Sequence, residues 1–371
     1  MASNKKNKGL VLVAILWIII VLTVIVTTLG RKSRLDSKIT LARMDAVRCK
    51  WACRAGIERA VAILDEDPRE TDCLTDQWNY SPDDFNDFQL ERCQFNVRVV
   101  DELSKLNINT ATREQLLGLP NMTVDVADAI IDWRDTDETP GEFGVEGGYY
   151  ENLPLGYLPR NDSFRTLREL LLVRGVTEEL FYGEDTNLNG RLDYNEMDGD
   201  ANPPADNMDA VLDKGWAAYL TCYPIESSSD TTQTAQDTTG QTTTQTTTTQ
   251  TQSSSGGGLV NINTASNVVL AALLGGTNEA YVIANAIIAY RNTLEYGIED
   301  PSELTQAGIL SSDILTQIQD YITVSSNIFY IRCVATTAQN GPYGTTLQTE
   351  AIIDRSSSPY EILYWYQGAS N

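Results

Sequence analysis

The amino-acid sequence predicts an α+β protein in which a long N-terminal helix covers a small antiparallel sheet, and a mostly α-helical domain is inserted into that sheet. Three observations predict this architecture. An apolar run near the N-terminus continues into an amphipathic helical pattern. One strand-like segment precedes a series of helical segments, and three strand-like segments follow them. The 371 residues suffice for two or three compact units, each with its own core.

The composition narrows the classes of function. The chain carries 27 Lys and Arg against 51 Asp and Glu, a formal net charge of −24, and it contains no histidine. Histidine ligands, histidine bases and Ser-His or Cys-His dyads are therefore absent. The negative charge repels phosphate backbones and disfavours a nucleic-acid-binding face. No positioned nucleophile or base replaces the missing histidine, so we expect a non-enzymatic protein whose carboxylates bind hard cations.

The N-terminal segment has the features of a membrane anchor. Residues 1–9 form a basic head that ends in Gly9, and residues 10–29 are apolar without interruption. At 1.5 Å per residue this run spans about 30 Å, the hydrocarbon thickness of a bilayer. A secretory signal peptide usually has a shorter apolar region and a small-x-small cleavage site. We therefore expect a transmembrane helix, although basic residues on both sides leave its orientation open.

Residues 30–67 are predicted to continue the same helix. Small and apolar side chains recur every three or four residues, at Leu35, Ile39, Ala42, Ala46, Cys49, Cys53, Ile57, Ala60 and Leu64. This spacing places them in one stripe, which we expect to lie on the folded body. Pro68 marks the latest possible end of the helix.

The predicted sheet is assembled from two distant parts of the chain. Residues 68–104 contain the alternating segment Phe95–Val99, and residues 324–371 contain strand-like segments at 328–334, 347–353 and 360–366. A strand before the helices and three strands after them indicate one sheet interrupted by an insertion.

The insertion contains a sequence repeat. Leu106–Ala111 recurs as Val260–Ala265, and each copy precedes an apolar helical run that ends in an aromatic residue and arginine. With Thr110 and Thr264 as N-caps, this predicts two helix-hairpin-helix-like units. They lie within residues 105–225, which include a Thr166–Glu169 capping box, and residues 259–323.

The two hairpins argue for a structural role. Helix-hairpin-helix motifs often bind DNA through a glycine-rich turn whose amides meet phosphates. Here the turns are Leu119–Met122 and Leu274–Thr277, without Gly-x-Gly and with no lysine or arginine following. Residues 226–258, between the two units, consist mainly of Ser, Thr, Gln and Gly, a composition typical of a flexible linker.

One motif predicts a metal site directly. Residues 185–196 match the twelve-residue EF-hand calcium loop at every ligand position, with Gly190 at the turn. The predicted ligands are Asp185, Asn187, Asn189, the carbonyl of Arg191, Asp193 and Glu196. No helix is expected after the loop, which favours an isolated structural clip over a paired sensor domain. A solvated acidic loop is the alternative.

Six cysteines leave the disulfide pattern open. If the body lies outside the cytoplasm, disulfides are permitted. Cys73 and Cys93 flank an irregular loop and are the preferred pair, while Cys49 or Cys53 on the helix could meet Cys333 on the sheet. Connectivity does not follow from sequence alone.

The basic head, the apolar helix and its amphipathic extension resemble the type IV pilin and pseudopilin family. The resemblance implies that residues 1–9 are a leader removed by a prepilin peptidase between Gly9 and Leu10. The fifth mature residue is then Ala14, where most members have glutamate. That glutamate is thought to pair with a neighbouring subunit, so its absence suits a subunit at a filament tip.

The inserted segment is similar to the K-type minor pseudopilins of type II secretion systems (general secretion pathway protein K). The similarity lies in Lys105–Asn109, Asp132–Asp137, Leu167–Leu170, Val173–Val176 and Val324–Asn327. It implies a pilin-like fold, an inner-membrane anchor, a periplasmic body, I- and J-type minor pseudopilins as partners and a role in initiating pseudopilus assembly. The alternative is a competence-type DNA receptor, which also joins a membrane helix to helix-hairpin-helix repeats but would need a basic hairpin face.

The same resemblance implies Ca²⁺ in the inserted domain. A second acidic cluster there contains Asp132, Asp135, Asp137 and Glu146, with Glu138 and Glu142 nearby. Spacing does not select the ligands among them, and an ordinary solvated face is the alternative.

Overall fold

The computed structural model describes residues 8–79, 85–86, 88–90, 92–197, 199, 204–224, 258–337 and 344–369. The predicted linker, apart from Gly258, lies outside the described residues.

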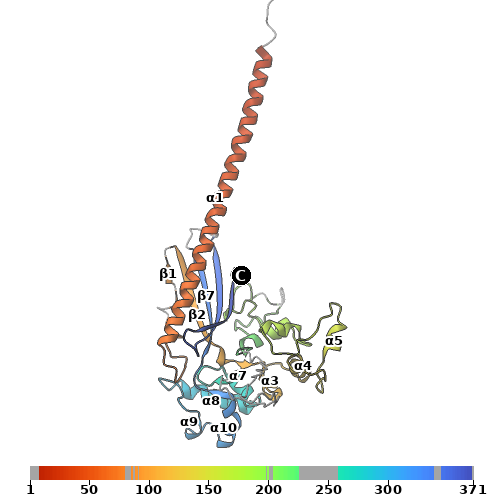
Figure 1. Ribbon diagram of the computed structural model, residues 1–371, viewed down its shortest axis with the longest axis vertical. Helices are drawn as coiled ribbons and strands as arrows, with labels where there is room; N and C mark the ends of the chain where they lie inside the picture. The colour runs from red at the N-terminus through yellow and green to blue at the C-terminus, as the bar shows by residue number, and fades with distance from the viewer. Residues whose placement is uncertain are drawn as a thin grey trace, which may run out of the picture.

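Helix α1 (Lys8–Glu66) is one continuous helix, and its N-terminal half projects away from the rest of the protein (Figure 1). The predicted cleavage point between Gly9 and Leu10 falls in its first turn. The helix is long and apolar enough to cross a membrane, with a mean hydropathy of 3.0 over its most apolar window and no burial of that window. The hydroxyls of Thr23 and Thr27 donate to carbonyls one turn back, which removes their free donors from this apolar segment.

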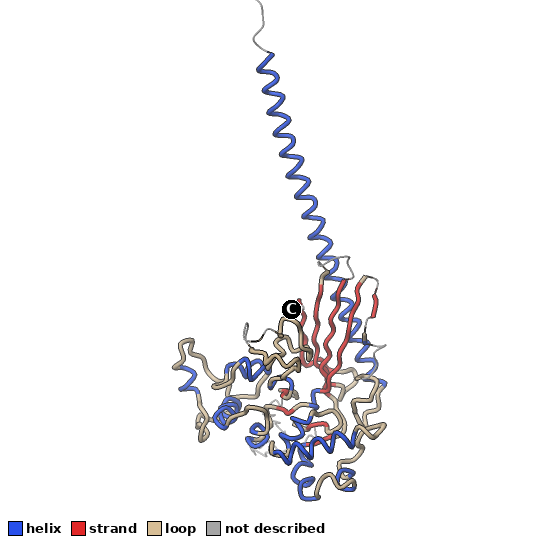
Figure 2. The backbone as a smooth tube through the Cα atoms, turned by 180° about the vertical axis from the view of Figure 1, so that it is seen from behind, coloured by secondary structure: helices blue, strands red, loops and turns tan. Residues whose placement is uncertain are grey.

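The C-terminal half of α1 packs on the body, beginning at Asp45. From Cys49 to Leu64 the predicted stripe is buried, and Ala52 and Val61 widen it. The prediction that the stripe lies on the folded body is wrong for its earlier part, because Leu35 and Ile39 are 58% and 42% exposed. Both residues precede Asp45, the first buried residue among those of α1 whose burial is described. Figure 2 shows that the N-terminal half of the helix projects beyond the sheet.

The sheet is antiparallel and its strands are ordered β1-β2-β7-β8-β9. The strands are β1 (Phe88–Leu90), β2 (Cys93–Asp101), β7 (Ile328–Thr337), β8 (Thr346–Asp354) and β9 (Glu361–Ala369). In β2 the side chains alternate between buried and more exposed, and the buried ones pack under α1. The predicted fold of a long helix on a small antiparallel sheet is confirmed.

The insertion lies between β2 and β7, which are neighbours in the sheet. Asp101 pairs with Phe329, so the chain leaves and re-enters the sheet at one place. The insertion has its own core, distinct from the core between α1 and the sheet. Both predicted repeat units contribute to this one core, so they form a single body and not two separate domains.

The sequence repeat is a structural repeat, built from a short strand, two helices and a closing strand. The first copy has β3 (Leu106–Asn107), α3 (Arg113–Leu117), α4 (Val124–Arg134) and β4 (Leu220–Thr221); the second has β5 (Val260–Asn261), α7 (Asn267–Leu273), α8 (Asn278–Arg291) and β6 (Ile322–Thr323). Each strand pair is parallel. The remaining elements are η1 (Glu102–Ser104), α5 (Gly147–Glu151), η2 (Leu167–Leu172), α6 (Glu178–Tyr182), η3 (Trp216–Ala218), α9 (Glu303–Gln306), α10 (Ser312–Ile318) and η4 (Gln319–Tyr321), where η denotes 3₁₀-helix.

The repeated Asn-Ile-Asn-Thr-Ala segment forms a turn before each first helix. In the first copy the Ala111 amide donates to the Asn107 carbonyl, and Arg134 donates to the Ala111 carbonyl. Arg291 makes the equivalent bonds in the second copy. The arginine at the end of the second helix of each copy therefore stabilises this turn.

The turn also displaces the helix starts. The predicted N-caps Thr110 and Thr264 are wrong, and the caps are Thr112 and Ser266, two residues later. Each cap hydroxyl accepts the backbone amide three residues on. The Thr166–Glu169 capping box is confirmed at the start of η2.

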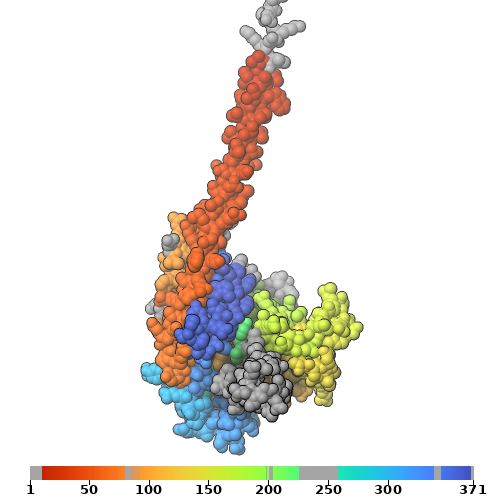
Figure 3. All heavy atoms as spheres, viewed as in Figure 1, coloured from red at the N-terminus to blue at the C-terminus, as the bar shows by residue number. Residues whose placement is uncertain are grey.

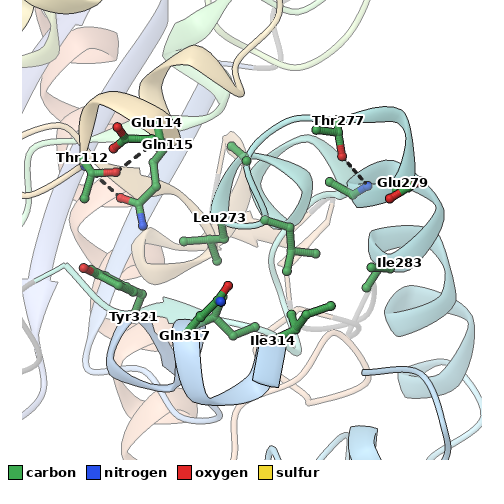
Figure 4. Close-up of a pocket in the computed structure, with 15 residues that line it drawn as sticks. Thr112, Glu114, Gln115, Leu273, Thr277, Glu279, Ile283, Ile314, Gln317 and Tyr321 are labelled. Carbon is green, nitrogen blue, oxygen red and sulfur yellow. Dashed lines mark hydrogen bonds between the residues drawn. The ribbon is translucent and has the colours of Figure 1, made fainter. Parts of the chain in front are cut away.

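The two helix pairs meet at the glycines of their hairpins. A Cβ on Gly276 would lie 2.3 Å from the Cα of Gly118, and one on Gly118 would lie 2.6 Å from the Cα of Ala272. Beside this contact is a cavity of about 480 Å³ between α3, α7, α8 and α10 (Figure 4). Glu114 and Glu279 are the charged residues among its lining side chains. The hairpin turns thus pack against each other.

Candidate calcium sites

Backbone amides of the predicted calcium loop donate to the carboxylates of its first and last residues, Asp185 and Glu196. Asp185 and Glu196 are each 5% exposed. The Asp185 carboxylate accepts the amides of Asn189 and Gly190 at 2.9 and 2.7 Å, and Glu196 accepts the amide of Thr186 at 3.0 Å. Gly190 has φ +73°, a backbone conformation that favours glycine, as the turn position of the motif requires.

The middle of the loop gathers further oxygens. The side-chain amides of Asn187 and Asn189 both donate to Oδ2 of Asp193, at 2.9 and 2.6 Å. A half-turn of either amide would present its oxygen in place of its nitrogen. The exposed Arg191 follows in the chain, and its amide donates to Asn189 Oδ1. The donor set is therefore one of hard oxygens, the kind that calcium prefers.

Two arginines of the sheet hold this loop. Arg98 on β2 donates to the carbonyl of Asn189 at 2.7 Å, and Arg332 on β7 donates to the carbonyl of Leu188 at 3.0 Å. A side chain at Gly190 would lie 2.6 Å from Arg98 Nη1. The loop thus belongs to the inserted domain but is fastened to the face of the sheet.

The second predicted cluster also converges. Carboxylate oxygens of Asp132, Asp135 and Glu146 lie within 4.8 Å of one another. Asp132 lies in the last turn of α4, and Asp135 directly follows the helix. Trp133 anchors this end of the helix in the core, where its ring packs edge-on against Tyr150 with 5.1 Å between the ring centroids. Glu146 is 8% exposed, and neither of its carboxylate oxygens has a hydrogen-bond partner. A buried carboxylate without a partner costs several kcal/mol, which a cation here would offset.

The electrostatics of this group favour a cation. Burial, together with the charges of Asp132 and Asp135, raises the pKa of Glu146 to about 7. Burial likewise raises the pKa values of Asp132 and Asp135. The amide of Gly141 donates to Asp132, and a Cβ on Gly144 would lie 1.8 Å from Asp132 Oδ2. The glycines therefore leave room for carboxylates that repel one another unless a positive charge lies among them.

One predicted ligand of this cluster lies outside it. Asp137 is exposed, and its carboxylate accepts the amide of Thr139 at 2.7 Å. Glu138 accepts a bond from Asn161, and Glu142 is exposed. Asp137 is therefore not among the three carboxylates that lie within 4.8 Å of one another, and its role as a ligand stays a prediction.

Comparison with known proteins bears on the identity of the chain. Residues 93–182 match the family model described as "Type II secretion system (T2SS), protein K". A curated relative, type II secretion system protein K of Klebsiella pneumoniae, is 24% identical over 199 residues, 48% of this chain. Part of this chain is therefore similar to type II secretion system protein K. The alignment spans 61% of the length of that relative.

A solved structure supports the same fold. The GspK-GspI-GspJ complex of the enterotoxigenic Escherichia coli type 2 secretion system contains a chain that matches with a TM-score of 0.59 at 16% identity. The match covers 89% of this chain and 99% of the other. The segment matched by the protein K model contains the Asp132 group and ends just before the 185–196 loop.

A third acidic group in this chain was not predicted. Asp67, Asp72 and Asp76 converge after α1, but Arg355 lies among them. Arg355 is 2% exposed and bonds Asp72 at 2.5 Å and the carbonyl of Leu64 at 2.8 Å. Because the guanidinium already supplies the positive charge, this group fastens the end of α1 to the sheet and is a poor candidate for a metal.

The two cysteines of the predicted Cys73–Cys93 pair have different neighbours. Cys73 Sγ lies 3.0 Å from Thr75 Oγ1 and 2.9 Å from Asp76 Oδ1. Cys93, the first residue of β2, faces α1, where its Sγ lies 3.9 Å from that of Cys49. The alternation of β2 turns Cys93 inward, and sequence distance gave no sign of this neighbour.

Proposed function

We propose that this chain is a non-enzymatic minor pseudopilin at the tip of the type II secretion pseudopilus, where it helps to initiate assembly and protein export. The observation that carries the proposal is the inserted domain at the end of the sheet remote from the projecting half of α1 (Figures 1 and 2). Its bulk would obstruct a subunit stacked beyond that end. Ala14 in place of the usual glutamate supports a subunit with no neighbour above it.

The apolar half of α1 supports an inner-membrane anchor with the body in the periplasm. Cleavage by a prepilin peptidase between Gly9 and Leu10 would then precede assembly. Edman sequencing of the membrane-extracted chain is expected to begin at Leu10. A retained leader would argue against the pseudopilin assignment.

The proposed partners are the I- and J-type minor pseudopilins. The similar solved chain is part of a GspK-GspI-GspJ complex. In this chain α1 exposes large apolar side chains both before the body begins, at Leu35 and Met44, and between its buried residues, at Val47 and Trp51. Contiguous exposed apolar surface of this kind is typical of protein interfaces.

Co-purification tests these partners. The full chain expressed with the I- and J-type proteins of the same system is expected to retain both through size exclusion. Trp51→Glu should weaken retention at least tenfold, since it places a charge in the apolar interface. Tyr194→Glu, a matched change at a 90% exposed aromatic residue of the inserted domain, should not. Equal retention of partners by both variants would contradict an interface on α1.

We propose that both acidic sites bind Ca²⁺ as structural clips. Calcium at about 100 times its dissociation constant would raise the unfolding free energy by about 2.7 kcal/mol per site. We expect chelation to lower the melting temperature of the detergent-solubilised chain and calcium to restore it. Glu146→Gln should abolish part of this shift, whereas Glu142→Gln, at an exposed neighbour, should leave it intact. A melting temperature indifferent to chelation would remove both sites.

The structure favours this reading over a DNA receptor. Amides of hairpin glycines would have to face phosphates, but the Gly276 amide donates to the Ala271 carbonyl and Gly118 lies against that hairpin. The cavity beside them is lined by two glutamates and by no lysine or arginine. Retention on immobilised DNA at low salt is expected to be no greater than that of an unrelated acidic protein.

A further inference from the structure

Two buried thiols face each other between α1 and the sheet. Cys49 is fully buried and Cys93 is 2% exposed, and their sulfurs are 3.9 Å apart. Cys49 belongs to the first turns of α1 that reach the body, whose first buried residue is Asp45. Cys93 is the first residue of β2 and points inward with Phe95 and Val97. The two therefore meet where the helix leaves the folded body.

The other cysteines have different surroundings. Cys73 contacts Thr75 and Asp76, and Cys222 lies 3.4 Å from the carbonyl of Arg165. Cys53 and Cys333 lie further along the same helix–sheet contact, with Cys53 Sγ 3.5 Å from the Cys333 carbonyl. Cys53 and Cys333 form a second thiol pair, joined by a hydrogen bond between their side chains. Cys49 and Cys93 are the pair at the point where α1 first reaches the body, with sulfurs 3.9 Å apart.

The chemistry of the pair permits a covalent link. A disulfide requires the sulfurs to approach to about 2.05 Å, which small side-chain rotations from 3.9 Å can supply. Burial raises the pKa values of both thiols, and the neighbouring Cys93 raises that of Cys49 further. Low thiolate content makes exchange slow once the pair is buried, so the link would form before α1 has packed fully on β2.

We propose that Cys49 and Cys93 form a disulfide that fastens α1 to strand β2 of its sheet. The inference rests on the proposed periplasmic location of the body. Two thiols lose two protons and two electrons as the S–S bond forms. A disulfide-carrying thiol oxidant of the compartment accepts the electrons through a mixed disulfide and leaves as a dithiol.

Peptide mapping of the full chain tests this. Cells are quenched in acid, free thiols are alkylated, and the membrane-extracted chain is digested without reductant. The expected product is a peptide pair joined through Cys49 and Cys93, with Cys73 alkylated. Alkylation of both Cys49 and Cys93 would overturn the proposal.

A second measurement distinguishes a failure of the Cys49–Cys93 pairing from a failure of the proposed periplasmic location. The reduced, purified full chain is unfolded in urea, refolded in the presence of oxidised glutathione and mapped in the same way. A bond that forms there but not in cells overturns the disulfide in vivo and counts against the periplasmic location. If no bond forms in either case, the pairing is wrong and the proposed pseudopilin function is untouched.

Stability supplies a readout independent of mapping. Closing the loop between residues 49 and 93 should raise the melting temperature, and a reductant should lower that of the cell-derived chain by about 10 °C. Cys93→Ser should remove this response to reductant, and Cys73→Ser should retain it. An equal response in the two variants would contradict the assignment.

Discussion

Replacing Gly276 by alanine is expected to destabilise the inserted domain by about 2–4 kcal/mol. About 1 kcal/mol arises because Gly276 has φ +69°, where an L side chain is strained. The rest arises because the new Cβ would lie 2.3 Å from the Cα of Gly118, which is backbone and cannot rotate away. The two helix pairs would have to separate, exposing part of their shared core.

The neighbouring glycine provides a matched control. Gly275 also has a left-handed conformation, φ +88°, but nothing lies within 4 Å of a Cβ built there. Gly275→Ala should therefore cost only the conformational part, about 1 kcal/mol. Urea unfolding followed by the fluorescence of the buried Trp133 and Trp216 measures both variants. Equal losses would show that the hairpins do not depend on this close approach.

Arg355→Met is expected to cost about 3–5 kcal/mol, because it leaves Asp67 and Asp72 buried without their cation. The guanidinium also bonds the carbonyls of Leu64 and Ser326, so the end of α1 and the entry to β7 lose a common partner. Hydrogen exchange is expected to increase at the C-terminal turns of α1 before it increases in the inserted domain.

The loss of unfolding free energy in Arg355→Met should depend on pH. Burial and the charges of Asp76 and Asp72 raise the folded pKa of Asp67 from 3.8 to about 7, so its ionisation between these values disfavours the folded state. The unfolding free energy therefore falls as the pH rises through this window, and loss of Arg355 removes the cation that limits the fall. The cost of Arg355→Met should thus be smaller at pH 5 than at pH 8. Arg92→Met, at an exposed arginine outside both proposed calcium sites, serves as the control.

Local patterns in the sequence were sufficient for much of the fold. The apolar run, the alternation around Phe95 and the Thr166–Glu169 capping box each involve residues close in the chain, so spacing alone carries their signal. The calcium loop belongs to the same class, since its predicted ligands lie within twelve residues. Calcium binding there stays a prediction; the carboxylates of Asp185 and Glu196 each accept a backbone amide of the loop.

The parts that sequence reasoning missed depend on distant partners. Arg355 meets Asp72 across 283 positions, and neither residue has a spacing that marks it. Cys93 was assigned to Cys73 because the two flank one loop, whereas the packing of α1 on β2 places Cys49 against it. Thr110 and Thr264 fitted the cap pattern, but turns held by Arg134 and Arg291 delay the helices. Tertiary packing decided each of these outcomes.

The pairing of Asp101 with Phe329 has a consequence for how such a chain could arise and be re-engineered. Because β2 and β7 are adjacent, a tight hairpin could replace everything between them and leave the five-stranded sheet and α1 complete. The inserted body and the sheet with α1 have separate hydrophobic cores. The same entry point would accept a foreign domain whose termini lie close together, so the scaffold could carry cargo-binding modules without redesign of its helix or sheet.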